Sequence, residues 1–391
     1  MQNFRFHTPT EVIFGKGTHY QIGETVKKYG FSKIMLHYGG GSIKRNGIYD
    51  VVMQSLSDAG IEVVDFGGAE PNPKLSLVEK GANICREEGV ELVLAVGGGS
   101  AIDSAKEIAV GAKYDGSTWD FSSKTKEPTD ALPVGVILTL SASGSEMSAS
   151  AVITNEENGL KRGYNSAFHR PLFAICNPEL TYTVDKFQTG CGIVDIMMHT
   201  LERYFSESPE TPLTDAFAEA LLRQVVAAGT KAILDPEDYE ARADLMWASS
   251  LSHNDLTGCG RSVFLTCHQL EHELSGKYDF VAHGAGLSII FPAWAEYVYK
   301  HNLERFTQFA VNVWDVPEDY DDPEETAIQG IVATKAFFAE IGMPTKLSQL
   351  GIGEEAFEEM AEKCTNYGKR ILPGYLPLGK KEIMDIFTLA L

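Results

Sequence analysis

Twice in the first hundred residues, a short apolar run of strand-forming residues stops at the tetrapeptide Gly-Gly-Gly-Ser. The first run, residues 33–38, ends at the glycines of 39–42, and the second, residues 91–96, ends at those of 97–100. A short run of this kind, when it is almost wholly apolar, is typical of a strand buried on both faces. Helical patterns lie between such runs. The alternation predicts βαβ units and a parallel sheet with helices on both faces.

The two halves of the chain carry different patterns. In the first half, further strands are expected at 61–66 and 132–139, and helices at 18–29, 47–59, 74–88 and 101–113. From about Val184 onward, apolar residues recur at helical spacing, which predicts helices at 215–233, 239–254, 323–342, 354–367 and 381–391. We therefore predict a Rossmann-like α/β domain over residues 1–184 and an all-α domain over residues 185–391, a division that suits a chain of 391 residues.

Composition and simple sequence patterns indicate which binding partners and which cellular compartment to expect. The chain carries 33 Lys and Arg against 54 Asp and Glu, a formal net charge of −21, which argues against binding nucleic acid. No apolar run reaches the ~20 residues of a bilayer-spanning helix, and the start of the sequence lacks the pattern of a secretory signal. The six cysteines form no CxxC pair. We expect a cytoplasmic protein with reduced thiols and no membrane partner.

The second glycine run comprises Gly97, Gly98, Gly99 and Ser100, between a buried strand and a helix. Consecutive glycines let backbone N–H groups approach an anion, and a helix N-terminus favours negative charge, so the turn suits a pyrophosphate. The spacing is not the GxGxxG of the ordinary Rossmann fingerprint, and a tight turn without a ligand would use the same residues. Asp103, in the first turn of the helix, either contacts a nicotinamide carboxamide or a ribose or is a simple N-terminal acidic residue.

The first glycine run bears on the choice of nucleotide. Many nucleotide-binding folds place an acidic residue at this strand end to hold the ribose 2′-hydroxyl. Here the strand is followed by Gly39, Gly40, Gly41 and Ser42. Lys44 and Arg45 come next, so the segment offers space and positive charge to a 2′-phosphate. Unless it is an ordinary surface turn, the pattern favours NADP(H) over NAD(H).

A third segment with small side chains, residues 141–147, follows the strand that ends at Thr139 and Leu140. It contains a glycine flanked by serines, among them Ser145. Small hydroxyl residues around a glycine suit close contact with a nucleotide, although a turn would use the same residues.

Histidines and an aspartate are paired in the second half. Asp195 and His199 are spaced i and i+4, as are His268 and His272, so each pair projects from one face of a helix. His283, followed by a glycine, begins another helical pattern. A carboxylate with imidazoles suits Fe(II) or Zn(II), although a single pair is often only a hydrogen bond. The combination favours a metal site in the all-α domain; His253 has similar local chemistry but no such pairing.

Together these motifs resemble the iron-containing (group III) alcohol dehydrogenases, and within them the butanol dehydrogenase branch. The resemblance extends over essentially the whole chain. It rests on PTEVIFGKG at 9–17, PNP at 71–73, GGGSAID at 97–103, GSE at 144–146 and the histidine motifs just described. It implies a homodimer of two-domain subunits, in which the first domain binds NAD(P) and the helical domain binds one divalent metal. The implied reaction is hydride transfer between NADP(H) and a short-chain aliphatic alcohol or aldehyde, of the butanol and butanal type.

The resemblance also implies roles for individual residues. The implied metal ligands are Asp195, His199, His268 and His283. His272 would line the substrate pocket, and the proton would leave through His272, through water or through the ribose. The implied cofactor contacts are Gly39, Gly40, Ser42, Asn72, Gly98, Ser100, Thr139 and Lys161.

Two features of the sequence depart from the pattern of the family. The interval from His268 to His283 is one residue longer than in the family, which a local insertion near 278–281 explains. Residues 261–266 lack a Gly-Asp-Trp, which leaves the substrate preference open.

Three other functions would use part of the same pattern. An enzyme of the glycerol dehydrogenase or dehydroquinate synthase type would take a polyol or sugar phosphate, with NAD in the glycerol case. A catalytically silent nucleotide-binding protein would use the Asp and His residues only to pack helices, and a metal-dependent hydrolase would leave the glycine turns without a use.

Overall fold

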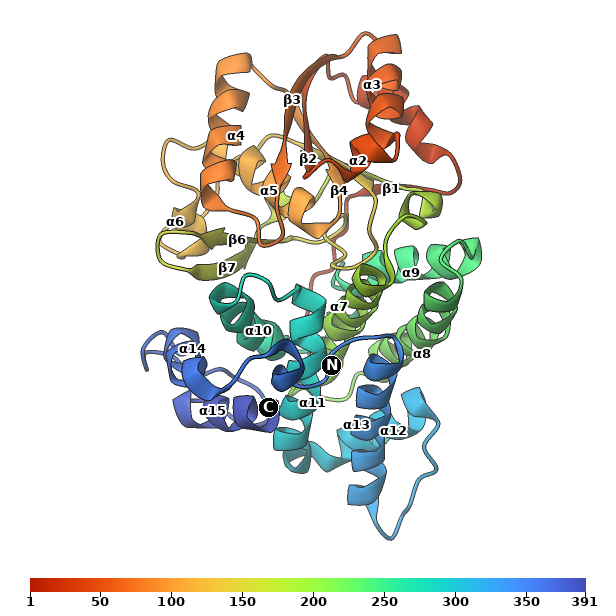
Figure 1. Cartoon of the computed structure of the whole chain (residues 1–391), viewed down its shortest axis with the longest axis vertical. Coiled ribbons are helices and arrows are strands. Elements are labelled where there is room, and N and C mark those ends of the chain that lie inside the picture. Colours follow the sequence, from red (N-terminus) through yellow and green to blue (C-terminus); the bar gives the residue numbers. More distant parts are fainter. The chain divides into compact units, whose positions relative to one another are not determined.

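The computed structural model describes all 391 residues, and they divide into two compact units (Figure 1). The sheet unit comprises His7–Val184 and Pro236–Asn254, and the helical unit comprises Met1–Phe6, Asp185–Asp235 and Asp255–Leu391. Residues 236–254, which we expected in the all-α domain, are thus part of the sheet unit.

The sheet unit is built on six parallel strands in the order β1-β8-β5-β4-β2-β3. Their bounds are β1 (Glu11–Phe14), β2 (Lys33–Gly39), β3 (Glu62–Ala69), β4 (Leu92–Gly97), β5 (Val134–Leu138) and β8 (Phe173–Cys176). β6 (Ser150–Asn155) and β7 (Leu160–Asn165) form a separate antiparallel hairpin. The expected strands correspond to β2, β3, β4 and β5.

Helices cover both faces of this sheet because its strands are apolar on both faces (Figure 1). In β4, Leu92, Leu94 and Val96 pack with α1 (Ile22–Lys28) and α3 (Ile48–Asp58). The alternate residues of β4 point to the other face, where α4 (Leu75–Glu88) and α5 (Gly99–Gly111) pack. The short helices α2 (Ser42–Arg45) and α6 (Trp119–Ser122) complete this part of the unit.

The helix α9 (Tyr239–Ser252) joins the sheet unit through side chains of its inner face. Met246 belongs to one of the two hydrophobic cores of that unit. The hydroxyl of Ser250 donates to Glu146 Oε1 at 2.6 Å, and Ser249 Oγ accepts from the N–H of Gly144 at 3.1 Å. These contacts explain why the division at 184/185 does not describe residues 236–254.

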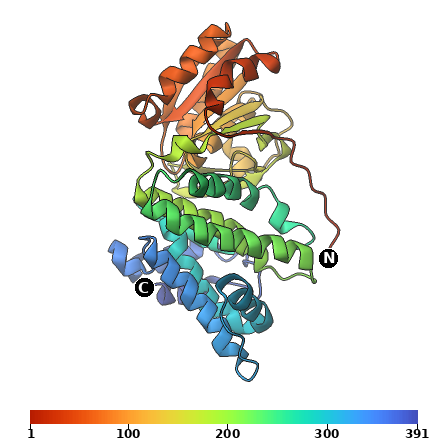
Figure 2. The ribbon, with the colours of Figure 1, turned by 90° about the vertical axis from the view of Figure 1, so that its right-hand side faces the viewer.

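The helical unit contains the remaining helices, and it holds the paired histidines. The helices of this unit are α7 (Lys186–Tyr204), α8 (Pro212–Leu234), α10 (Thr266–Lys277), α11 (His283–Val298), α12 (Leu303–Trp314), α13 (Pro323–Glu340), α14 (Phe357–Cys364) and α15 (Lys380–Leu389). The long helices α7 and α8 lie side by side (Figure 2), and α11 packs against both α7 and α10. No helix in the structure has the length and hydropathy needed to cross a bilayer.

Candidate functional site

In the sheet unit, both glycine runs lie where the chain reverses its direction across the sheet. The chain passes from β2 outward to β3, then returns to β4 on the other side of β2 and continues to β5. Parallel sheets bind ligands beyond the carboxyl ends of their strands at such a reversal. β2 ends at Gly39 and its neighbour β4 ends at Gly97, so the two runs share this edge.

The second glycine run is packed closely against the segment after β5. The N–H of Thr139 donates to the carbonyl of Gly97 at 3.0 Å. A Cβ on Gly98 would lie 3.1 Å from Leu140 Cβ, and one on Gly99 would lie 2.5 Å from Ser143 Oγ. Ser100 continues the first turn of α5. The structure therefore brings these predicted residues together, and close packing accounts for part of the glycine content.

The first glycine run is less closely packed than the second, but Lys44, the basic residue that follows it, already has an acidic partner. A Cβ on Gly40 would meet no atom within 4 Å, and Ser42 is exposed at the start of α2. Lys44 Nζ lies 3.7 Å from Asp65 Oδ2 and over the ring of Tyr49, whose hydroxyl donates to the same oxygen at 2.9 Å. An acidic residue, Asp65 on β3, is thus present near this edge, which the sequence analysis missed.

Asp103 and Ser145 belong to a buried polar cluster around β6. Asp103 Oδ1 accepts from Ser145 Oγ at 2.6 Å, and its Oδ2 accepts from the N–H of Val152 at 3.0 Å. Burial raises the pKa of Asp103, and burial lowers the pKa of its neighbour Lys106 to about 8. The carboxylate on which we expected a cofactor contact therefore already has two partners within the unit.

Asn72 and Lys161 lie on either side of β6, Lys161 on β7 of the same hairpin and Asn72 in the segment before α4. Thr154 on β6 pairs with Lys161 on β7, and the N–H of Thr154 donates to the carbonyl of Pro73 at 2.7 Å. Asn72, just before that proline, has a left-handed backbone with φ of 56°, and both Asn72 and Lys161 are buried. The hairpin thus places these two predicted residues near one another.

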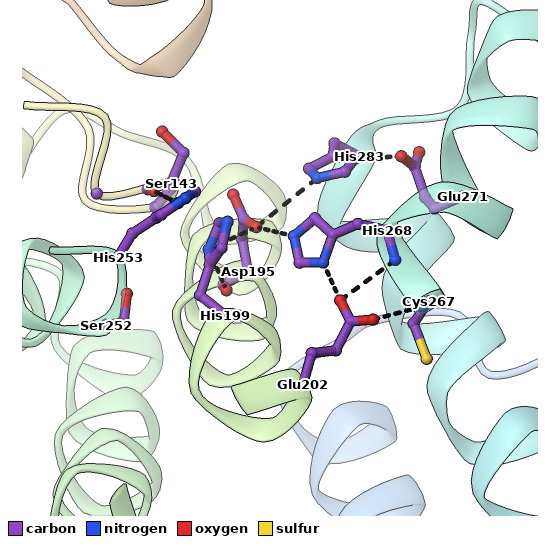
Figure 3. A network of polar contacts seen from close by, with 12 residues as sticks. Ser143, Asp195, His199, Glu202, Ser252, His253, Cys267, His268, Glu271 and His283 are labelled. Carbon is purple, nitrogen blue, oxygen red and sulfur yellow. Dashed lines mark hydrogen bonds and ion pairs between the residues drawn. The ribbon is translucent and has the colours of Figure 1, made fainter. Parts of the chain in front are cut away.

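In the helical unit, three of the predicted metal ligands, Asp195, His199 and His268, offer ligand atoms within 4.8 Å of one another, and the fourth, His283, lies beside Asp195 (Figure 3). Asp195 and His199 come from consecutive turns of α7, His268 comes from the first turn of α10, and His283 is the first residue of α11. The nearest imidazole nitrogens of the three histidines lie 3.3, 3.6 and 3.7 Å from Asp195 Oδ1. Asp195, His199 and His268 are buried, whereas the side chain of His283 is 28% exposed, so solvent reaches the cluster at His283.

The donor atoms of this cluster fit a divalent metal. Two ligands bound at ~2.1 Å and separated by a tetrahedral angle lie about 3.4 Å apart, close to the 3.6 and 3.7 Å that separate Asp195 Oδ1 from Nε2 of His268 and of His283. Asp195 Oδ1 and His268 Nε2 are buried and make no hydrogen bond in the structure. Polar atoms that are buried without a hydrogen bond are costly unless another group satisfies them. A cation bound among these atoms would remove that cost, and carboxylate with imidazole suits Fe(II) or Zn(II).

Two glutamates that the sequence analysis did not single out lie behind these histidines. His268 Nδ1 contacts Glu202 on α7, and His283 Nδ1 contacts Glu271 on α10 (Figure 3). Burial alone would lower the pKa of His268, but the carboxylates of Glu202 and Asp195 raise it to about 9. The spacing could have indicated Glu202, because it stands seven residues after Asp195 on the same face of α7.

The glycine after His283 has a packing reason. A Cβ on Gly284 would lie 2.2 Å from the carbonyl oxygen of Cys191 on α7, so only glycine lets α11 begin this close to α7. The loop of residues 278–282 between α10 and α11 contains the segment in which we expected an insertion, and its length leaves His283 beside His268.

The two remaining histidine candidates differ in position. His272 is half-buried, and its ring centroid lies 5.6 Å from that of His283. It is therefore next to the cluster on the side that solvent reaches. His253 belongs to the sheet unit, where its Nδ1 lies 2.8 Å from the carbonyl oxygen of Ser143.

Two family models match the chain and together span most of it. Residues 9–178 match "Iron-containing alcohol dehydrogenase", and residues 189–391 match "Fe-containing alcohol dehydrogenase family, C-terminal".

Individual relatives match over nearly the full length of the chain. It is 44% identical to NADH-dependent butanol dehydrogenase A of Clostridium acetobutylicum over 388 residues, which is 99% of each chain. It is 37% identical to the NADPH-dependent aldehyde reductase YqhD of Escherichia coli over 374 residues, 94% of each chain. Among solved structures, NADH-dependent butanol dehydrogenase A from Thermotoga maritima matches with a TM-score of 0.96 at 39% identity, covering 100% of this chain and 99% of that one. The names of these relatives divide between the two nicotinamide coenzymes.

Proposed function

The chain belongs to the iron-containing alcohol dehydrogenase family, as its motifs predicted, and from that premise we propose that it is a metal-dependent aldehyde reductase and alcohol dehydrogenase using NADP(H). The proposed substrates are short-chain aliphatic aldehydes and alcohols of the butanal and butanol type. The observation that carries the metal dependence is the convergence of Asp195, His199, His268 and His283 around buried atoms that make no hydrogen bond.

Each group of residues has a distinct task in this reaction. The ligand set would hold one Fe(II) or Zn(II), which when bound supplies Lewis-acid polarisation of the substrate oxygen. The reduced nicotinamide, when bound, would supply the hydride for the carbonyl carbon, and the carbonyl oxygen must then gain a proton to give the alcohol. His272 would relay that proton, a role that its half-buried position beside His283 supports. The glycine runs at the edge of β2 and β4 would hold the dinucleotide.

The preference for NADP(H) rests on the first glycine run. No acidic residue stands at the end of β2 itself, and Gly40 and Ser42 leave that end open. The carboxylate of Asp65 counts against a preference for NADP(H), because it already forms an ion pair with Lys44. The ratio of kcat/KM for NADPH to that for NADH tests the preference, which fails if the ratio is below one. Gly39→Asp is expected to lower the ratio at least tenfold, because a carboxylate would repel the 2′-phosphate.

The first experiment is NADPH oxidation with butanal by the protein as purified, after chelation, and after addition of Fe(II) or Zn(II). Activity that disappears with the chelator and returns with one of the metals supports the proposal and ranks the metals. Turnover of glycerol with NAD in place of butanal would instead support the polyol reading. Nucleotide binding without turnover under any metal would identify a silent nucleotide-binding protein. The proposed homodimer is tested separately by light scattering during size-exclusion chromatography.

A further inference from the structure

Two of the three histidines in the cluster are each held from behind by a carboxylate of a neighbouring helix (Figure 3). Glu202 of α7 contacts Nδ1 of His268 on α10, and Glu271 of α10 contacts Nδ1 of His283 on α11. Thus α7 provides the carboxylate for the histidine of α10, and α10 provides the carboxylate for the histidine of α11. His199 differs, because its Nδ1 lies 3.0 Å from a main-chain oxygen, that of Asp195.

The chemistry of the contact fixes the tautomer of each ring. An ionised carboxylate only accepts hydrogen bonds, so the Nδ1 atom that contacts it must carry the proton. In a neutral imidazole the lone pair is then on Nε2. Nε2 of His268 lies 3.6 Å and Nε2 of His283 lies 3.7 Å from Asp195 Oδ1, on the side of the proposed metal.

Both glutamates are built into the fold and are not surface groups that rotate freely. The side chain of Glu202 is 3% exposed and that of Glu271 is fully buried. Glu202 also accepts from the backbone N–H groups of Cys267 and His268 in the first turn of α10, a helix that has no side-chain cap from its own Leu265. An anion at this end of a helix is favoured by the unsatisfied N–H groups and the helix dipole.

Glu271 is placed by a glycine on the facing helix. A Cβ on Gly286 of α11 would lie 2.7 Å from Glu271 Cγ and 2.9 Å from its Oε1. Any larger residue at position 286 would therefore force the carboxylate away from its present position beside His283. The position of the Glu271 carboxylate beside His283 therefore depends on the absence of a side chain at Gly286.

We propose that Glu202 and Glu271 are positioning residues for the metal site: they hold His268 and His283 in the Nδ1-protonated tautomer and direct both Nε2 atoms at the ion. This inference rests on the proposed metal site. Such outer-shell carboxylates orient imidazole ligands and raise their basicity. Their loss is therefore expected to appear first as weaker metal binding, ahead of any change in substrate contacts.

The test is the affinity of the metal-free protein for Zn(II), measured by competition with a chromophoric chelator. Glu271→Ala and Glu202→Ala are expected to weaken binding about 10- to 100-fold. Glu271→Gln is expected to lose less, because its amide oxygen still accepts from Nδ1. Gly286→Ala changes no charge and is expected to weaken binding by displacing Glu271. The Co(II)-loaded variants are expected to show an altered visible spectrum, which reports the ligand field directly.

The matched control is Glu219→Gln in the same unit, because Glu219 is a buried carboxylate whose hydrogen bonds go to Tyr204, Gln308 and Asn312 and not to a ligand. Its Zn(II) affinity is expected to stay within twofold of the parent protein. If Glu202→Ala unfolds α10, seen by circular dichroism of the metal-free protein, the Glu271 and Gly286 variants still decide the matter. Parent-like affinity and spectrum in Glu271→Ala, or equal losses in Glu271→Ala and the control, overturn the inference. Failure of the parent protein to bind Zn(II), Co(II) or Fe(II) would instead overturn the proposed metal site.

Discussion

Each unit of the molecule buries a cluster of ionisable side chains, around Lys106 in the sheet unit and around Asp195 in the helical unit, and these two clusters are satisfied in different ways. In the sheet unit, Lys106 Nζ donates to Ser145 Oγ at 2.8 Å and to the carbonyl of Ser150 at 2.7 Å, and Ser148 provides two further acceptors. In the helical unit, Asp195 Oδ1 and His268 Nε2 make no hydrogen bond. The ammonium of Lys106 is thus fully paired within the protein, whereas these two atoms of the second cluster would be satisfied by a bound cation.

The pKa shifts alone would not separate the two clusters. Burial lowers the pKa of Lys106 to about 8, and at His268 the effect of burial is outweighed by Glu202 and Asp195, which raise the pKa to about 9. Perturbed pKa values occur both at functional sites and in structural ion-pair networks. What distinguishes the helical unit is the convergence of one carboxylate and three imidazoles, in which Asp195 Oδ1 and His268 Nε2 make no hydrogen bond.

The largest effect is expected from Asp195→Ala. The variant removes the carboxylate to which all three histidines turn, so we expect loss of bound metal and a fall in kcat/KM of at least about 10³-fold. Metal content per chain and NADPH oxidation with butanal measure the two effects. The metal-free variant should retain its far-ultraviolet circular dichroism.

Asp385→Ala is the control, because Asp385 pairs with Lys381 on the surface of the same unit, where its side chain is 42% exposed. This control is expected to keep its metal and its activity. Full activity in Asp195→Ala would show that the cluster in the helical unit is as self-contained as that of Lys106.

Sequence patterns predicted what is local in this molecule. The α/β and all-α architecture is confirmed, because the strands β2 to β5 are apolar runs bounded by glycine or turn residues and the helices have strong periodicity. β1 and β8 were missed because each has four residues, too few to show a period. The placement of 236–254 was missed because a helical pattern does not indicate which core the helix will join.

The same limit applies to the candidate site. Spacing within α7 and within α10 brought Asp195, His199 and His268 into the prediction. Glu202 and Glu271 act across helices, on His268 and His283, so their partners depend on how α7, α10 and α11 pack. Acidic residues are common on helices, and spacing alone does not separate these two from solvated ones.

The next largest effect is expected from Lys106→Met, which probes the self-contained cluster. Removing one partner of a buried charged network leaves the others without compensation, so we expect the free energy of unfolding to fall by about 3–5 kcal/mol. Urea unfolding followed by circular dichroism measures it. Lys113→Met, which removes an exposed charge two residues beyond the end of α5, should change it by less than about 0.5 kcal/mol. A stable Lys106→Met protein would mean that the cluster does not depend on its cation.

Metal removal is expected to have a smaller effect, confined to the helical unit. A ligand at a hundred times its dissociation constant stabilises the state that binds it by about 2.7 kcal/mol. Hydrogen exchange should therefore show stronger protection of peptides from α7, α10 and α11 when Zn(II) is added. Peptides from β2 and β4 should exchange at an unchanged rate. Equal protection of both sets would contradict the assignment of the ion to the helical unit.

The smallest effect is expected from protonation of His37, a buried group of the sheet unit. Burial lowers the pKa of His37 to about 4, despite the carbonyl of Phe66 that accepts from its Nδ1 at 2.7 Å. Because a histidine in the unfolded chain has a pKa near 6.5, the unfolded state binds more protons between pH 6.5 and about 4. The stability that neutral His37 contributes is therefore present above pH 6.5 and is lost as the pH falls, by at most about 1.4 kcal/mol per pH unit.

His37→Gln tests this expectation, because its amide can still donate to Phe66 but does not titrate. Urea unfolding at pH 7, 6 and 5 should show a shallower loss of stability in this variant than in the parent protein. His301→Gln, which removes an exposed histidine, should keep the pH dependence of the parent. If His37→Gln also keeps it, then His37 takes up its proton without unfolding the sheet unit.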